Sequence, residues 1–518
     1  MATSVVALCA FGSAARAQEP VDLEAGAIRQ LRKATVYRAN GLHHSLLLAL
    51  RDLRDPTMQP LFQSLVQADH WSIQLDAILG LAELSAEGRV DPWLLAKLRS
   101  DRDRADGVRV ALELGLLQRP DIEKILGWDD LASVARVVLL AEYRRLGGTP
   151  DPSMLARLAA NPDPPVAGLA ACLLAEGSPT PSGTAGSEAA PATPPDRTAL
   201  DAFAKMLDTL SPEDRDAAIE EVANAARRYQ LPSAIALLAP RVDGSNDSPG
   251  PQESVVGLAL ALDAKRGLVL WKTGLGKEPS QSKRVRYGLI LLLNATRVPA
   301  DSFDALLPPK GKGASAESAR DPLLAAMVAA GKALASGREP AKALTALYDM
   351  GHRRCCRWVL GAADELDTEG AKTIYLHVID RLDIPKERTA DALVDAIEAS
   401  ARLIERDPEA LRARLLSTQD DGPKQEAMLL GLANSRSPAA ATAAESTTRL
   451  GAGRADTLAL VVLARHRDTL TADELRQLGL VAGGGGQIDE SLRAQAAWLY
   501  LRHLGKLEQS LPKIVGGT

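Results

Sequence analysis

The sequence predicts an all-α protein, built as an α-solenoid of antiparallel helix pairs. Aromatic residues make up only 3% of the chain, Ala and Leu are abundant, and the alternation typical of strands is hard to find. Residues 55–84 form two short amphipathic segments joined by a polar turn, and related units recur along the chain. Because one such pair cannot bury both of its apolar stripes, we expect neighbouring pairs to cover one another in a stack.

Residues 1–17 are expected to be a secretory signal peptide. A short apolar run extends from Val5 to Phe11, and Ala15-Arg16-Ala17 places small residues where signal peptidase cleaves, before Gln18. No Lys or Arg stands near Met1, which leaves open an atypical signal or a start codon placed too far downstream. The expected location of the mature protein is therefore secreted or periplasmic.

Charge and hydropathy disfavour several classes of partner. The formal net charge is −5 and the pI is about 5.9, with both signs mixed along the chain, so neither nucleic acid nor an anionic membrane is an expected partner. No segment after the N-terminus has the roughly 18 apolar residues in a row that a membrane span requires. After signal cleavage three cysteines remain, too few for a disulfide scaffold, so stability must come from packing.

The clearest helix pair lies between Asp55 and Leu84. The turn Ala68-Asp69-His70 separates its two apolar stripes, and Gln74 is expected on the exposed, polar side of the second helix. The first stripe consists of Leu61, Leu65 and Val66, and the second of Ile73, Ala77, Ile78, Leu81 and Leu84.

The repeat period emerges when the second helices are aligned on their first inward aliphatic residue. The intervals are 35, 26 and 32 residues in the N-terminal part, 30 in the middle, and 31 and 34 near the C-terminus. The aligned residues are Ile73, Val108, Val134 and Val166, then Val255 and Val285, then Ala427, Leu458 and Leu492. A period in this range is typical of helical repeats.

Residues at these places resemble the HEAT repeat, in which a turn Asp precedes a Val-Arg pair, an Ala and a Leu-Gly. Tetratricopeptide repeats have a similar length, but their Trp-Leu-Gly-Tyr-Ala-Phe framework is not sustained here. The resemblance implies stacked helix pairs, with Asp at the helix N-terminus and small residues at close contacts. It is carried by Asp69, Ile73, Gln74, Ala77 and Leu79-Gly80, by Val108-Arg109 with Leu114-Gly115, by Val166 with Ala170, and by Val285-Arg286; residues 323–416 show helices without the signature.

The predicted domains are an N-terminal HEAT-like array at residues 18–177 and a C-terminal helical repeat array at 199–518. Between them, residues 178–198 contain five prolines and small polar residues without apolar periodicity, so we expect a disordered linker.

The sequence contains no complete motif for metal binding, cofactor binding or catalysis. His43 and His44 are adjacent on a predicted helix and point about 100° apart, so they are not expected to hold one ion together. The stretch Trp271–Glu278 lacks the first glycine and the final Ser or Thr of a phosphate-binding loop, and we expect a helix-ending glycine turn instead. A Gly-x-Ser-x-Gly elbow is absent from the sequence.

One segment combines basic and aromatic residues densely enough to hold an anionic partner. Its candidate partner-binding residues are His352, Arg353, Arg354, Arg357 and Trp358. The favoured interpretation is a solvated helix face whose arginines pair with Asp364, Glu365 and Asp367, because the overall charge is acidic.

Within the same segment, Cys355 and Cys356 have two interpretations. The favoured one is packing into the core, since one of the pair would face inward with Val359. The other is a reactive or vicinally oxidised pair, whose thiolate the nearby arginines would favour if the thiol were exposed.

These observations favour an exported helical-repeat scaffold that binds a protein partner and is not an enzyme. Two alternatives stay open. The resemblance allows a HEAT-like lyase or another helical-toroid enzyme, although no residue here is identified as catalytic. The other alternative is a structural component of the cell envelope whose role is assembly.

The signal peptide yields the first testable prediction. We expect the mature chain to begin at Gln18, because the Ala15-Arg16-Ala17 motif follows an apolar run. Intact mass of the protein isolated from its source cells measures this. Recovery of a chain that keeps Met1 from a cytoplasmic fraction would refute both cleavage and export.

Overall fold

The computed structural model describes residues 22–177, 197–244, 249–307, 321–384, 386, 389–418, 422–445, 447, 454–484 and 488–516. Every regular element in these ranges is a helix, which confirms the predicted all-α class. The described residues divide into two compact units, one formed by both ends of the chain and the other by residues 54–447. These units do not coincide with the predicted arrays 18–177 and 199–518.

The first unit joins segments that are far apart in the sequence. Its N-terminal helices α1 and α2 pack against α27, and α1 also contacts α26 and α28. The Gln30 amide donates to Glu490 at 2.7 Å across 460 residues of sequence, and Lys33 pairs with the same carboxylate at 3.0 Å. The helices are α1 (Leu23–Thr35), α2 (Leu42–Leu53), α25 (Arg454–His466), α26 (Ala472–Ala482), α27 (Glu490–His503) and α28 (Leu507–Val515).

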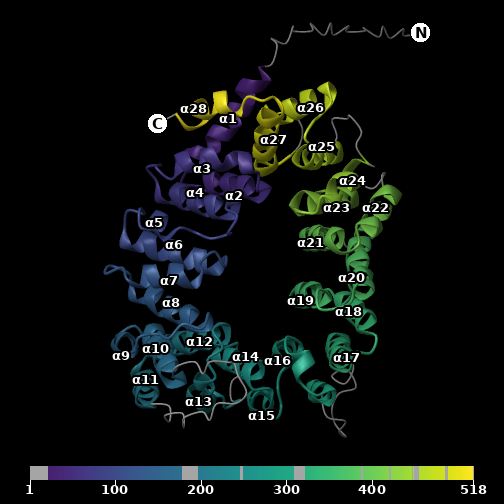
Figure 1. Cartoon of the computed structure of the whole chain (residues 1–518). Coiled ribbons are helices and arrows are strands. Elements are labelled where there is room, and N and C mark those ends of the chain that lie inside the picture. Colours follow the sequence, from purple (N-terminus) through teal and green to yellow (C-terminus); the bar gives the residue numbers. More distant parts are fainter. Residues whose placement is uncertain are drawn as a thin grey trace, which may run out of the picture. The chain divides into compact units, whose positions relative to one another are not determined.

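The second unit contains the remaining described helices, in which short and long elements follow one another (Figure 1). They are η1 (Pro56–Met58), α3 (Gln59–Leu65), α4 (Trp71–Leu84), α5 (Pro92–Leu95), α6 (Asp101–Glu113), α7 (Arg119–Leu126), α8 (Ser133–Arg145), α9 (Pro152–Ala159), α10 (Pro164–Glu176), α11 (Thr198–Thr209), α12 (Pro212–Arg228), α13 (Ser233–Leu238), η2 (Ala239–Arg241), α14 (Pro251–Leu262), α15 (Ala264–Leu275), α16 (Gln281–Leu292), η3 (Ala295–Arg297), η4 (Ala300–Leu306), α17 (Pro322–Ser336), α18 (Pro340–Tyr348), α19 (Arg353–Ala363), α20 (Thr368–Asp380), η6 (Arg381–Asp383), α21 (Ala390–Arg406), α22 (Pro408–Ser417), α23 (Gly422–Asn434) and α24 (Ala439–Glu445).

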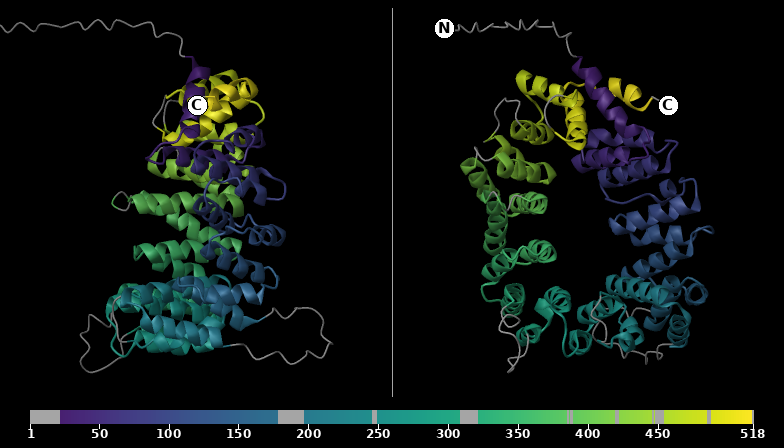
Figure 2. Two further views of the ribbon diagram at one scale, coloured as in Figure 1. Left: turned by 90° about the vertical axis from the view of Figure 1, so that its left-hand side faces the viewer. Right: turned by 180° about the vertical axis from the view of Figure 1, so that it is seen from behind.

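Alternate helices of the second unit form a continuous row. Each of α4, α6, α8, α10, α12, α14 and α16 contacts the next member of the row, and α19, α21 and α23 do the same further along the chain. Helices lie side by side through the unit in both views of Figure 2. The predicted pair at residues 55–84 is confirmed, with α3 and α4 on either side of the turn.

Eight of the nine aligned inward residues are buried, at 0–8% exposure, in α4, α6, α10, α14, α16, α23, α25 and α27. The prediction for Val134 is wrong, because this side chain is 53% exposed and α8 instead buries Ala135 and Val137. A one-residue change of phase turns a helix by about 100°, so the inward face of α8 begins one residue later.

Two further expectations at the first helix pair are wrong. Asp69 does not cap α4; His70 is the N-cap and accepts from the Ser72 N–H, while Asp69 pairs with Arg99 at 3.1 Å. Gln74 is 7% exposed rather than on a solvated face, and its Oε1 has no hydrogen-bond partner in the described part of the chain. The cause is that α3 and α6 both contact α4, so two neighbours cover it.

Small residues set the closest helix contacts. A Cβ added at Gly431 of α23 would lie 2.5 Å from the Ser400 Cβ and 2.7 Å from the Ile397 carbonyl oxygen of α21. At Gly80 of α4 it would lie 2.8 Å from the Phe62 ring of α3. Any larger residue would push these helices apart, since real Cβ atoms do not approach neighbours so closely.

An ionic cluster around one buried lysine connects η6 and α20 to α23. Lys424 is fully buried, and its ammonium pairs with Asp380 at 2.9 Å and Asp383 at 2.8 Å. Arg414 of α22 shares both carboxylates. Because the two carboxylates share the buried ammonium, loss of either aspartate would still leave Lys424 one ion-pair partner.

Two predicted segments fall largely outside the described residues. The signal peptide at 1–17 does so completely, and the linker at 178–198 does so up to residue 196. Helix α11 begins at Thr198, and both α11 and α12 contact α10 on the other side of the segment. Among the described helices, none has the length and apolarity needed to cross a membrane.

The second prediction tests the packing of α4. Ala77 is fully buried there, so Ala77→Glu would bury a carboxylate without a partner and should cost about 3 kcal/mol or more of local stability. Ala156 is an exposed alanine on α9, and Ala156→Glu should cost less than about 0.5 kcal/mol. Hydrogen exchange of peptides that cover each helix measures both local changes. Equal protection of the two variants would contradict the observed burial of α4.

Candidate partner-binding site

The predicted basic and aromatic cluster lies at the start of α19. Its helix begins after His352, which is the N-cap residue in extended conformation. Cys355, Val359 and Ala363 are fully buried at helical spacing, so this stripe faces the core. The opposite face carries Arg353, Arg354 and Arg357, all exposed, with half-buried Trp358 beside them.

The predicted ion pairs between the arginines of α19 and the acids that follow them are wrong, most clearly for Asp364. Asp364 is bound by Arg402 of α21 and accepts from the Tyr375 hydroxyl at 2.5 Å, and Asp367 caps α20 through the Gly370 N–H. Arg353 pairs instead with Asp391 of α21. The arginines of α19 therefore do not use the acids that follow them in sequence.

Arg354 and Arg357 line a groove to which α12, α14, α16 and the turn that follows α16 also contribute residues. The groove has a volume of about 490 Å³. Four helices form it, namely α12, α14, α16 and α19, and the last residues come from the turn after α16. Its lining residues are Glu220, Asn224, Arg227, Glu253, Ser254, Gly257, Arg286, Leu289, Ile290, Leu293, Asn294, Arg354, Arg357 and Trp358.

An apolar strip from α16 forms part of this groove. Leu291 and Leu292 are buried in the core, whereas Leu289 and Ile290 are half-buried and Leu293 is 61% exposed. Because a helix turns by 100° at each residue, a run of five apolar residues must present some of them away from the core. An exposed leucine in a groove is a stronger sign of a binding surface than scattered apolar residues elsewhere.

Basic side chains in the groove differ in whether they are already paired. Arg286 pairs with Glu253 at 2.6 Å, with both side chains largely buried. By contrast, Arg227, Arg354 and Arg357 form no ion pair with any residue that the structure describes. The lining therefore holds four guanidinium groups against two carboxylates, Glu253 and the exposed Glu220.

Arg227 and Ile290 both approach Gly257 of α14. A Cβ at Gly257 would lie 3.6 Å from the Arg227 Nη1 and 3.9 Å from the Ile290 Cγ2. A guanidinium of α12 and an apolar side chain of α16 thus meet over the same point of α14. Asn294, which matches a glycosylation acceptor in sequence, is buried beside them and donates its amide to the Ile290 carbonyl at 2.9 Å.

A second cavity, of about 360 Å³, lies on the other side of α19 and shares Arg357. Its polar groups bond mainly to one another: the Tyr348 hydroxyl donates to Asp395 at 3.0 Å, and Arg353 is held by Asp391. Burial raises the pKa of Asp395. Because these polar groups already have hydrogen-bond or ion-pair partners within the protein, we do not assign this cavity as a binding site.

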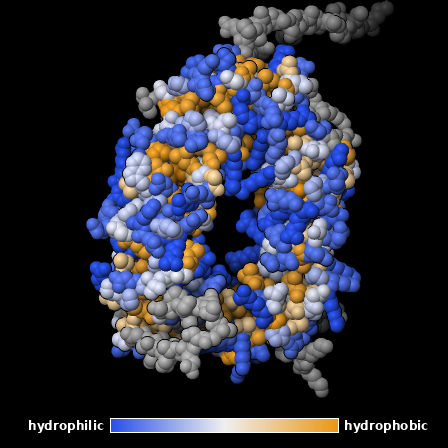
Figure 3. Space-filling model, in the orientation of Figure 1, coloured by the Kyte–Doolittle hydropathy of each residue, from blue (hydrophilic) through white to orange (hydrophobic). Residues whose placement is uncertain are grey.

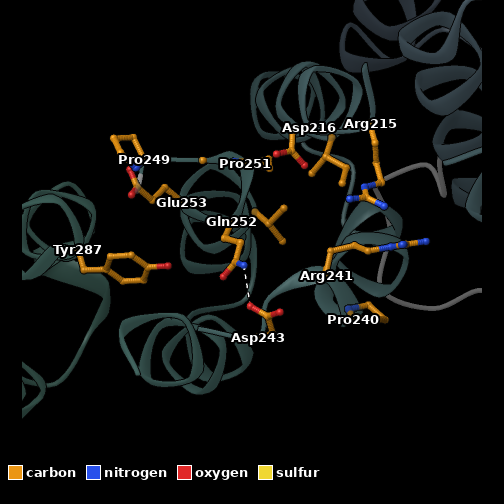
Figure 4. A pocket seen from close by; sticks show the side chains of 13 residues that line it. Arg215, Asp216, Pro240, Arg241, Asp243, Pro249, Pro251, Gln252, Glu253 and Tyr287 are labelled. Carbon is orange, nitrogen blue, oxygen red and sulfur yellow. Dashed lines mark hydrogen bonds between the residues drawn. The ribbon is translucent and has the colours of Figure 1, made fainter. Parts of the chain in front are cut away.

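Figure 4 shows a third cavity, of about 330 Å³, between α12, α14 and α16. Here too the polar groups are largely matched: Gln252 donates to Asp243 at 2.8 Å, and Arg241 pairs with Asp208 at 2.6 Å. We assign this cavity no function.

Both cysteines of α19 are packed. Cys355 is fully buried, and Cys356 is 8% exposed with its thiol donating to the Tyr348 carbonyl at 3.5 Å. Burial raises the pKa of Cys355 to about 11 and that of Cys356 to about 12. Burial outweighs any effect of the nearby arginines on these thiols, since it is the largest cause of both raised pKa values.

Other sequence motifs have structural roles. Gly276 ends α15 in the left-handed region at φ +78°, as expected for a helix-ending turn, and Trp271 is buried with its indole N–H donating to the Tyr287 carbonyl at 2.9 Å. His43 is 3% exposed and accepts from the Arg38 N–H at 3.2 Å. Within the described ranges, no group of three or more His, Cys, Asp or Glu is placed to hold a metal ion.

Comparison with known proteins adds no family. The chain matches no family model and no curated protein sequence.

The third prediction concerns the thiols. Burial raises the pKa of both thiols above that of a free cysteine, so few of them are ionised in the folded protein at pH 8. Iodoacetamide should therefore leave both unmodified in the native state and alkylate both in denaturant, as intact mass will show. Rapid alkylation of the native protein at either position would contradict the packed assignment.

Proposed function

We propose that this chain is an exported helical-repeat scaffold, a HEAT-like α-solenoid, which binds a protein partner in the groove lined by α12, α14, α16 and α19. The observation that carries the proposal is the composition of this groove. It joins an exposed leucine, a half-buried tryptophan and three arginines without an ion-pair partner in the described residues. Trp and Arg are the residue types most enriched at the energetic centres of protein interfaces.

The contacts among alternate helices support the solenoid interpretation. In a solenoid each repeat contacts its neighbours, and the exposed side of one helix row forms an extended surface. Helices α12, α14 and α16 are consecutive members of such a row. The sequence period of about 26–35 residues agrees with one helix pair per repeat.

A binding role is favoured over catalysis by the state of the polar groups. Three carboxylates near the cavities, Glu253, Asp243 and Asp395, are engaged in ion pairs or hydrogen bonds, whereas Glu220 and Asp216 are exposed. A general acid or base needs free access to a substrate proton, and a nucleophile needs a base at hydrogen-bond distance. The buried thiols of α19 meet neither condition.

Surface hydropathy is compatible with a partner of limited contact area. On the face that Figure 3 shows, apolar residues reach the surface in separate patches among hydrophilic ones. Such a surface favours a local docking groove over an interface that covers a whole face.

The fourth prediction compares two exposed apolar residues of nearly equal exposure. Leu293 lies in the groove and is 61% exposed, whereas Val269 on α15 is 63% exposed and does not line it. Leu293→Asp should reduce capture of the native partner by about tenfold or more, since it places a carboxylate in an apolar contact. Val269→Asp should leave capture unchanged.

The measurement is affinity capture from the source cells with the mature protein and both variants as bait, quantified by mass spectrometry. Thermal melts that match the parent protein would show that both variants are folded. A stoichiometric partner lost only with Leu293→Asp supports the proposal. Equal capture by all three baits would exclude the groove as the binding site, and a retained small molecule in place of a protein would favour the enzyme alternative.

A further inference from the structure

We infer that the groove takes an acidic peptide segment of the partner, in which carboxylates flank an apolar side chain. This inference rests on the proposed function, because it specifies the ligand of the same groove. It depends on how charge, apolar surface and hydrogen-bonding groups are distributed among the four helices.

Charge is the first argument. Where arginines of the second unit form ion pairs between helices, their partner often lies about one repeat away: Arg99 with Asp69, Arg241 with Asp208, and Arg414 with Asp380 are separated by 30, 33 and 34 residues. Arg227 and Arg354 have no such partner in the described residues, and Arg357 forms no ion pair there, although its charge acts on Asp395 in the neighbouring cavity. Their guanidinium groups are free to bind carboxylates of a ligand, which they match with paired N–H donors.

Position is the second argument. Arg227 enters the groove from α12, while Arg354 and Arg357 enter from α19. The apolar side chains Leu289 and Ile290 belong to α16 and Leu293 follows its end, and Ile290 comes within 4 Å of the same point over Gly257 as Arg227 does. A ligand that satisfies this arrangement needs negative charge and an apolar group close together.

The third argument separates a peptide from other polyanions. The chain has a net charge of −5, and Glu220 and Glu253 stand in the groove itself, so a continuous phosphate backbone would meet two carboxylates. Trp358 is the one aromatic residue in the lining, whereas single-stranded nucleic acids are bound on several stacking aromatics. Separate carboxylates along a peptide can avoid the two glutamates.

Size and hydrogen bonding agree with a short segment. A volume of about 490 Å³ falls within the range of pockets that hold a ligand of a few residues. The exposed amide of Asn224 offers both a donor and an acceptor to a peptide backbone. The indole of Trp358 can cover an apolar side chain beside Leu293.

The fifth prediction is tested by fluorescence anisotropy with the full mature chain. The probe is a labelled peptide of sequence Gly-Glu-Leu-Glu-Glu-Leu-Glu-Gly. One control peptide replaces each Glu by Gln, and another replaces each Leu by Ser. Both should bind at least about tenfold more weakly, because each lacks one of the two features that the groove matches.

Matched variants assign the binding to the groove. The double variant Arg354→Gln, Arg357→Gln should weaken binding of the acidic probe at least about tenfold. Arg266→Gln, which removes an exposed arginine of α15 outside the groove, should leave it unchanged. All three positions are exposed on helices, and thermal melts will confirm that the variants fold.

Three outcomes would overturn the inference: equal binding of the Glu and Gln peptides, no effect of the double variant, or tighter binding of a single-stranded oligonucleotide than of the acidic probe. Its failure is distinguishable from that of the proposed function. If Leu293→Asp still abolishes partner capture while the acidic probe does not bind, the groove is a protein-binding site for a different kind of segment. If capture is also insensitive to Leu293, both proposals fail.

Discussion

The structure of the second unit depends on mutual burial of its alternate helices. In α10 all eight residues from Val166 to Leu173 are buried, and in α4 the eight residues from Ile73 to Gly80 are. Helices of 13 and 14 residues are marginal alone in water, so these two persist only because neighbours cover them. Helix formation and stacking are therefore coupled. Close contacts at Gly431 and Gly80 then set how near adjacent helices lie, since a side chain at either glycine would force them apart.

Local patterns were sufficient to predict much of this fold. The helix pair at 55–84, the burial of eight of nine aligned residues, and the helix end at Gly276 all follow from spacing and glycine geometry within one or two turns. The errors arose where packing against neighbouring helices determines whether a side chain is buried. Gln74 is polar, yet α3 and α6 contact α4 together and bury it. Val134 is the first aliphatic residue of its helix, but the helix presents the next residue inward.

For the candidate site, too, the sequence could predict local features but not contacts between distant helices. Composition alone located the basic cluster on α19, because its residues are contiguous in sequence. The groove could not be predicted, since Arg227 and Leu293 approach it from helices about 130 and 60 residues earlier in the chain. The ion-pair partners of the arginines could not be predicted either. Asp391 binds Arg353 from 38 residues away, while the nearer Asp364 binds Arg402. One signal was available, namely that the apolar run Leu289–Leu293 is too long for one helix face.

Ion pairs explain why this part of the surface differs from its surroundings. Charged side chains on successive repeats lie about 30–40 residues apart in sequence and close in space, so a stacked helical protein can neutralise its own surface by pairing each repeat with the next. Exposed pairs of this kind add little stability, but they occupy guanidinium groups that would otherwise attract anions. Where that pairing stops, at Arg227, Arg354 and Arg357, positive charge stays available beside exposed apolar side chains. A groove with available positive charge and exposed apolar side chains is bound favourably by a ligand that carries both carboxylates and an apolar group. The carboxylates replace water on the arginines, and the apolar group removes the apolar strip from contact with water.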